Sequence, residues 1–361
     1  MNYKFKSFVK VALIALFTTL PAAIAADIAT KSISEPGSIK INGGGSVPLA
    51  ILYKVWGESY QARYPEVSMS YKISNVVKGI ADLEENKIDY AGSEIPLKAD
   101  ELKKRGLFQF PTALISFAPV ANIPGVHSGQ LRLDDATLAG IFLGTIKKWN
   151  DPRLVELNPK LALTDAEIVT VHRNSGNTIT YVLSSYLSKV SPEWATTVGV
   201  GSTLKWPVGL EIGKGTNEEM LDYIKTTPYS IGFTLLPLVL KNKLNLIKMK
   251  NKNGNFVSAT PEGVMSAASN AKWNEEEGFY NILTNQPGAD TWPFVMTSYT
   301  VIKLDPANPQ NTKKLIHFFD SELKRGQIEV ISVDLIPLPD EVSEIIRTAL
   351  KKQHIGETGK K

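Results

Sequence analysis

Cysteine is absent from all 361 residues of the sequence. The chain therefore forms no disulfide and offers no thiolate ligand to a metal ion. Histidine is almost as scarce, and its four copies, His127, His172, His317 and His354, are scattered without a His-Glu-x-x-His pair. We therefore expect neither a bound metal nor another cofactor.

Catalytic motifs are also missing. The sequence has no Gly-x-Ser-x-Gly elbow. Residues 209–216, GLEIGKGT, approach a phosphate-binding P-loop, but Gly209 and Gly213 are one residue too close together and Lys214 is followed by glycine. We interpret this segment as a turn. Neighbouring carboxylates such as Glu84 and Glu85 lie in charge runs that are typical of solvated helix faces. We therefore expect that the protein is not an enzyme.

No apolar run reaches the ~20 residues that span a bilayer. The N-terminus instead carries Lys4, Lys6 and Lys10 ahead of the uncharged residues 11–20, followed by PAAIA. This pattern predicts a signal peptide at residues 1–25 with an Ala-x-Ala cleavage site. Because no cysteine can follow the cleavage site, we expect an exported protein that is not a lipoprotein.

Excess charge of either sign is absent once the leader is removed. The leader takes three lysines and no acidic residue, which leaves 37 basic against 36 acidic residues from totals of 40 and 36. No block of lysine or arginine interleaved with aromatic residues remains, so nucleic-acid binding is not expected. The remaining length, roughly 335 residues, exceeds what a single core usually holds and favours two domains.

Strand-like and helix-like segments alternate along the mature chain, which predicts an α/β fold. Residues 67–74 alternate apolar and polar like a strand, and residues 76–97 indicate a helix followed by a short strand and a turn. Further helices are expected at residues 175–190, 217–226 and 311–325, and further strands at 114–120, 168–172, 230–233 and 298–304. Because no long linker is present, two lobes would have to be joined within continuous structure, as in hinge closure around a ligand.

A glycine-rich turn opens the mature chain. In residues 41–60, INGGGSVPLAILYKVWGESY, an apolar segment leads into Gly43, Gly44, Gly45 and Ser46, and then into a helical pattern. The glycines permit a tight turn and close approach to a ligand, while Ser46 is a good N-cap at the positive end of a helix. The segment is either an anion-binding cradle or an ordinary turn with a cap.

A second turn of the same kind occurs in residues 171–187, VHRNSGNTITYVLSSYL. A predicted strand ends at His172 and delivers Arg173, a polar turn and then a helical run. A guanidinium group suits a tetrahedral oxyanion, although Arg173 could equally serve a structural ion pair. Two such turns in separate halves of the chain favour an anion site.

Long strings of the mature chain resemble the periplasmic phosphate-binding protein of the ABC phosphate importer, the Pst-type solute-binding protein family. They are GLFQFPTALISFAPVANIPG (106–125), LDDATLAGIFLGTIKKWNDP (133–152), LNPKL (157–161), SSYLSKVSPEW (184–194), GSTLKWPVG (201–209), LTNQPGADTWPF (283–294) and HFFD (317–320). The resemblance implies a type II periplasmic-binding-protein fold, with two α/β lobes, a hinge and an inter-lobe cleft. Lobe one would comprise residues 27–114 and 292–361, and lobe two residues 115–291.

The resemblance also implies a function. The protein would bind inorganic phosphate or a related oxyanion in the cleft and deliver it to the membrane permease subunits of an ABC importer, as a periplasmic monomer. Release from the cell stays open. The family holds phosphate with helix N-termini, hydroxyl groups and one arginine, and a carboxylate accepts the proton of the ligand, which would reject sulfate.

The family's ligand contacts fall, by resemblance, on Gly45, Ser46, Val47, Ser74, Glu94, Arg173, Ser175, Gly176, Asn177 and Thr178. Either Ser175 or Asn177 takes the place of the family's loop serine. The site departs from the family pattern, because Glu94 replaces an aspartate, Val47 replaces an aromatic residue, and residues 75–77, Asn-Val-Val, replace a glycine-rich stretch. The alternative hypothesis is therefore a divergent scaffold with weak or no phosphate binding, exported to bind another ligand or partner.

Overall fold

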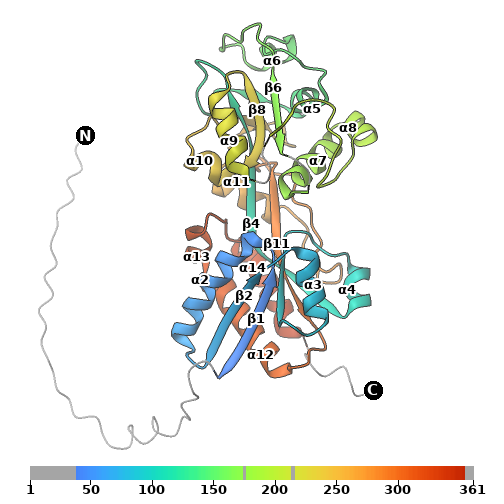
Figure 1. The fold of residues 1–361 in the computed structure, drawn as a ribbon, viewed down its shortest axis with the longest axis vertical. Coiled ribbons are helices and arrows are strands. Elements are labelled where there is room, and N and C mark those ends of the chain that lie inside the picture. Colours follow the sequence, from blue (N-terminus) through green and yellow to red (C-terminus); the bar gives the residue numbers. More distant parts are fainter. Residues whose placement is uncertain (1–37, 174–175, 213–215, 354–361) are drawn as a thin grey trace, which may run out of the picture.

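The computed structural model describes residues 38–173, 176–212 and 216–353. The predicted signal peptide, residues 1–25, lies outside this part of the chain, and so does Ser175. Figure 1 shows two groups of helices and strands, one above the other, connected by the long strands β4 (Leu107–Asn122) and β11 (Val295–Lys303). We refer to the lower group as lobe one and to the upper group as lobe two.

Lobe one contains both ends of the described chain. Its elements are β1 (Ile39–Gly45), α2 (Val47–Arg63), β2 (Val67–Ile73), α3 (Val76–Glu84), β3 (Tyr90–Ser93), α4 (Ala99–Arg105), α12 (Pro309–Arg325), α13 (Gln327–Ser332) and α14 (Asp340–Lys352). Aromatic side chains fill its core, where Tyr53, Tyr90 and Phe110 all lie within 6 Å of Phe319, measured between ring centroids.

Lobe two is formed by the middle of the chain. Its elements are β5 (Arg132–Leu133), α5 (Asp135–Leu143), α6 (Pro152–Leu157), β6 (Val169–Arg173), α7 (Thr178–Val190), α8 (Pro192–Thr197), β7 (Leu210–Ile212), α9 (Asn217–Thr226), β8 (Ser230–Leu235), α10 (Leu236–Lys241), β9 (Lys248–Lys250), β10 (Phe256–Val257) and α11 (Pro261–Ser269). Phe294 packs between Tyr186, Phe233 and Trp292 in its core.

One sheet runs through both lobes in the order β2-β1-β3-β11-β4-β8-β6-β7. The first part of β4 pairs with β11, and its last six residues, 117–122, pair with β8 of lobe two. Neighbouring strands within β2-β1-β3 pair in parallel, and so do neighbouring strands within β8-β6-β7. The α/β fold predicted from the sequence is therefore confirmed.

Some predicted elements have different limits in the structure. Residues 210–212 form strand β7 and pair with β6, so the interpretation of residues 209–216 as a turn is wrong for these three residues. The long-range pairing with β6 supplies the hydrogen bonds that the local sequence does not indicate. Helix α7 begins at Thr178 rather than at Ser175, because the side chain of Asn177 accepts the N–H of Thr180 as an N-cap.

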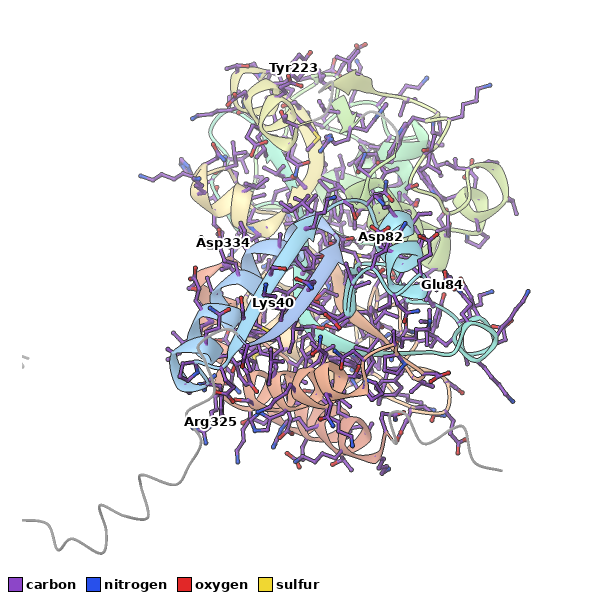
Figure 2. The ribbon with its side chains drawn as sticks, turned by 60° about the horizontal axis from the view of Figure 1, so that its bottom comes forward. Lys40, Asp82, Glu84, Tyr223, Arg325 and Asp334 are labelled. Atoms are coloured by element: carbon purple, nitrogen blue, oxygen red, sulfur yellow. The ribbon has the colours of Figure 1, made fainter. Side chains whose placement is uncertain are left out.

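The surface carboxylates of α3 form ion pairs. Figure 2 shows Asp82 and Glu84 near the end of this helix. Glu84 Oε1 accepts from Arg105 Nε at 2.7 Å, and Asp82 Oδ1 lies 2.9 Å from Lys78 Nζ. Within the described residues, no group of histidine and carboxylate side chains is arranged to hold a metal ion. Among the described helices, none combines the length and apolar character needed to cross a membrane.

Candidate functional site

Three helix N-termini border one cavity of about 440 Å³ between the lobes. Helices α2 and α3 come from lobe one, and α7 comes from lobe two. The cavity is lined by Ser46, Val47, Pro48, Ser74, Asn75, Val76, Val77, Glu94, Ile95, Gly176, Asn177, Thr178, Tyr181 and Ser202. The partial positive charge at the start of each helix favours an anion in this space. None of these lining residues, all within the described part of the chain, is a lysine, arginine or histidine.

The lobe-one wall contains a buried serine–glutamate pair. Ser46 Oγ donates to Glu94 Oε1 at 2.5 Å, and the two residues are only 2% and 7% exposed. Burial raises the pKa of Glu94, while the hydrogen bond from Ser46 acts in the opposite direction. Ser46 occupies the N-cap position of α2, but its hydroxyl makes no cap bond, so its expected capping role is not seen. The hydroxyl is directed to Glu94 instead.

Glycines bring the backbone segments of this wall close together. Gly45 ends β1 with φ of 117°, and a Cβ atom there would lie 2.5 Å from the carbonyl oxygen of Gly92. At Gly79 of α3, a Cβ atom would lie 2.7 Å from the Cα atom of Gly45. A side chain at Gly45 would separate β1 from β3, and one at Gly79 would separate α3 from β1. Gly79 and Gly92 were not predicted, because neither belongs to a recognisable local motif.

Helix α3 starts at Val76, as the sequence predicted. Asn75 is its N-cap and accepts the N–H of Lys78 at 2.8 Å, whereas Ser74 Oγ donates to the carbonyl oxygen of Asn75. The Ser74 N–H donates to Gly45 O at 2.8 Å and fixes this turn against β1. Both Ser74 and Asn75 line the cavity. Val77, in the first turn of α3, is 81% exposed there.

The lobe-two wall is formed by the start of α7 and a neighbouring loop. The backbone N–H groups of Gly176 and Asn177 both donate to Ser202 O, at 2.8 and 3.2 Å. Thr178 is the first residue of α7, and Tyr181 follows in its first turn. Ser202 and Tyr181 were not predicted as site residues. Ser202 is far in the sequence from the start of α7, and the sequence pattern of Tyr181 is typical of a residue packed in the core.

Arg173 is directed toward another helix. Its Nη1 donates to the side chain of Asn217, the first residue of α9. Burial lowers the pKa of Arg173, whereas the charges of Glu218 and Glu219 raise it. Arg173 is not among the residues that line the cavity. The structure therefore does not place it with the other predicted ligand contacts.

The predicted site residues thus divide into groups. Seven of them line the same cavity: Ser46, Val47, Ser74, Glu94, Gly176, Asn177 and Thr178. Gly45 lies behind Ser46 at the end of β1, Arg173 contacts α9, and Ser175 is outside the described residues. The cavity combines helix N-termini, hydroxyl groups and one buried carboxyl, which is a chemistry suited to an anion that carries a proton.

The sequence of the chain matches a known protein family. Residues 30–322 match the model of the PBP superfamily domain. The chain is 36% identical to the phosphate-binding protein PstS of Haemophilus influenzae, over 90% of this chain and 96% of the relative. It is also 36% identical to the PstS protein of Pasteurella multocida, over 92% and 95%.

Solved structures agree on the fold. An ABC-type phosphate transport receptor from Vibrio cholerae superposes with a TM-score of 0.55, covering 83% of this chain and all of that one, at 19% sequence identity. Identity at this level supports a shared fold and not a shared ligand. The periplasmic-binding-protein fold expected from the sequence is therefore confirmed.

Proposed function

The chain belongs to the PBP superfamily and, within it, to the PstS-type phosphate-binding proteins, and from this membership we propose that it binds inorganic phosphate between its lobes and delivers it to an ABC importer. We further propose that residues 1–25 are removed on export and that the mature protein acts in the periplasm as a monomeric, unlipidated receptor. Residues 27–114 and 292–361 would form lobe one, and residues 115–291 lobe two. Its partners would be the membrane permease subunits, and it would catalyse no reaction.

The observation that carries this proposal is the convergence of three helix N-termini on a cavity that contains the Ser46–Glu94 pair. Fixed backbone dipoles attract an anion without the cost of reorganising mobile charges. A carboxylate in the same cavity repels an anion unless one of the two carries a proton. Hydrogen phosphate carries such a proton, and sulfate at neutral pH does not.

Ligand binding would change the hydrogen bond of Ser46. A serine hydroxyl has a single proton to donate, and in the structure that proton is directed to Glu94. When hydrogen phosphate donates its own proton to Glu94, the Ser46 hydroxyl becomes available to an oxygen of the ligand. The pair would thus select a protonated tetrahedral anion, and Gly176, Asn177 and Thr178 would complete the site from lobe two.

A second candidate function follows from Arg173 and α3. Arg173 contacts Asn217 rather than the cavity, and Val76 and Val77 occupy the start of α3 where the family is glycine-rich. Both features favour a scaffold with weak phosphate affinity that acts as an exported binding protein for another ligand. The two candidates differ in one measurable property, the affinity for phosphate.

Isothermal titration calorimetry separates them. The mature chain, unfolded to remove bound ligand and then refolded, is titrated with phosphate and with sulfate. We expect binding of phosphate and none of sulfate. The absence of phosphate heat from a protein with a folded far-UV spectrum would contradict the receptor function and leave the second candidate.

Matched serine variants identify the site. Ser46→Ala should weaken phosphate binding by at least tenfold, corresponding to about 1.4 kcal/mol. Ser59→Ala is the control, because Ser59 Oγ also donates to a glutamate, Glu329, at 3.1 Å, but does not line the cavity. Equal phosphate affinity in the two variants would mean that Ser46 does not contact the ligand.

A further inference from the structure

The cavity has an apolar rim on its lobe-one side. Val47, Val77 and Ile95 line it and are 57%, 81% and 43% exposed. Pro48 and Val76 line it as well. Apolar side chains gain free energy when a ligand or another surface covers them. A bare inorganic ion is fully polar and provides no such cover.

Eight of the 14 lining residues are polar, and the two most deeply buried of them, Ser46 and Glu94, directly precede the rim residues Val47 and Ile95 in the sequence. Ser46 and Glu94 are almost completely buried, whereas Val77 is the most exposed of the lining valines. Ligand pockets for organic molecules combine apolar walls with placed polar groups and begin at volumes of about 300 Å³. The volume of about 440 Å³ lies within that class.

We propose that the cavity takes a phosphoryl group that carries a short alkyl substituent, as in an alkyl phosphonate, in addition to inorganic phosphate. The phosphoryl oxygens would occupy the space between the helix N-termini, and the P–OH group of the monoanion would donate to Glu94. The alkyl chain would extend across Val47, Val77 and Ile95. This inference rests on the proposed function, because it uses the same oxyanion site.

The rim has a competing explanation, since closure of the lobes could bury it against Tyr181 and Ser202. In that case Val77 would contribute equally to the binding of every ligand. If the alkyl chain covers the rim, Val77 contributes only to ligands that carry such a chain. The two explanations therefore differ in how one substitution changes selectivity.

The experiment compares phosphate with methyl-, ethyl- and propylphosphonate by calorimetry on the ligand-stripped mature protein, at about pH 6.5, where monoprotonated phosphoryl groups are abundant. We expect affinity to rise about three- to fourfold with each added methylene, which corresponds to ~0.8 kcal/mol. A stepwise fall in affinity with chain length would overturn the proposal.

Variants of Val77 test the rim directly. Val77→Asn and the shape-conserving Val77→Thr should abolish the gain in affinity with chain length, measured in each variant relative to its own affinity for phosphate. Val155→Asn is the control, because Val155 is also an exposed helical valine, on α6, outside the cavity. An equal loss of affinity for all four ligands in the Val77 variants would mean that the rim is buried by lobe closure and not by the alkyl chain, which would overturn the inference.

The outcomes also distinguish this inference from the function on which it rests. Binding of phosphate without any phosphonate would overturn the inference and leave the phosphate receptor intact. Binding of phosphonates without phosphate would contradict the receptor function and support the alkyl-bearing ligand. Binding of neither would contradict both.

Discussion

On the lobe-one wall of the cavity, the Ser46–Glu94 pair lies inside the fold, whereas the polar groups of the lobe-two wall lie closer to solvent. Ser46 and Glu94 are buried and bonded to each other. Asn177 and Thr178 are only partly buried, and the nearby Arg173 is directed to Asn217. The first wall is thus formed before a ligand arrives, while the second holds a potential ligand group in another contact.

The difference indicates a division of labour between the walls. A preorganised wall determines which anion fits, because the fold holds the oxygen atoms of Ser46 and Glu94 in place even when the Ser46 proton changes its partner. A wall that exchanges hydrogen bonds contributes to affinity only after that exchange, so its net contribution is smaller. Substitutions in lobe one should therefore have large effects on stability and selectivity, and substitutions in lobe two should have small effects on affinity.

The largest effect is expected for Gly45→Ala. A Cβ atom at this position would meet Gly92 O at 2.5 Å, and the backbone has a φ of 117°. We expect a loss of about 4 kcal/mol in the free energy of unfolding, from the combined clash and backbone strain. Urea denaturation followed by far-UV circular dichroism measures this loss.

The control for this variant is Gly254→Ala. Gly254 also has a positive φ, 86°, but a Cβ atom there would have no neighbour within 4 Å. Strain alone should cost about 1–2 kcal/mol at this position. Equal losses in the two variants would mean that the close packing of β1 on β3 does not make the lobe-one wall rigid.

A smaller effect is expected for Ser46→Ala. The substitution leaves the buried carboxyl of Glu94 without its side-chain donor, which should cost about 2 kcal/mol of unfolding free energy. Ser59→Ala removes a more exposed bond to Glu329 and should cost about 0.5 kcal/mol. Urea denaturation of both variants provides the comparison. A cost for Ser46→Ala no larger than that of Ser59→Ala would show that burial does not strengthen the pair.

The pH dependence of stability tests the same pair. Burial raises the pKa of Glu94 in the folded protein above its ordinary value in the unfolded chain. The folded state then binds the proton more tightly, so the stability contributed by Glu94 is complete below the unfolded pKa and is lost as pH rises through the folded pKa. Each pH unit of the window between the unfolded and the folded pKa corresponds to about 1.4 kcal/mol in the free energy of unfolding.

Glu94→Gln should remove this loss and make the protein more stable than the wild type above the window, with equal stability below it. Glu84→Gln provides a contrast of opposite sign, because the hydrogen bond from Arg105 lowers the pKa of Glu84. That variant should lose stability at neutral pH by a small amount, since the pair is partly exposed. Urea denaturation between about pH 4 and pH 8 measures both. A Glu94→Gln curve parallel to the wild type would contradict a raised pKa.

The sequence predicted one part of the lobe-one wall, the glycine-rich turn, but not the contacts that complete it. The glycine-rich turn at Gly45 and Ser46 was found because its signal is local. Gly79 and Gly92 determine how closely α3 and β3 approach that turn, but their function depends on contacts between distant segments. The hydrogen bond between Ser46 and Glu94 was also beyond local patterns, because 48 residues separate its partners.

In lobe two, the sequence predicted a strand at residues 168–172 and a helix at 175–190, within three residues of the limits of β6 and α7, but not the orientation of Arg173. A strand followed by a polar turn and a helix is a periodic, local pattern. The choice of Asn217 as a partner depends on how β6 and α9 pack, which the sequence pattern does not encode. The resemblance to phosphate-binding proteins predicted the overall fold more reliably than these side-chain contacts, because folds are conserved through changes in their sites.

The smallest effect is expected at Asn217, the partner of Arg173 on α9. If Arg173 moves to the ligand on binding, it must first leave the side chain of Asn217. Asn217→Ala removes that competing bond, which is worth about 1 kcal/mol, and should tighten phosphate binding by up to about fivefold. Asn217→Asp should have the opposite effect, because a carboxylate holds the guanidinium more strongly than an amide does.

Calorimetry of the two Asn217 variants in an Arg173→Ala background completes the comparison. Without the guanidinium, neither substitution at Asn217 should change phosphate affinity by more than twofold. A persistent effect would mean that Asn217 acts through the start of α9 and not through Arg173. Weaker binding in Asn217→Ala alone would mean that Asn217 orients Arg173 for the ligand, so that the lobe-two wall is as preorganised as the wall of lobe one.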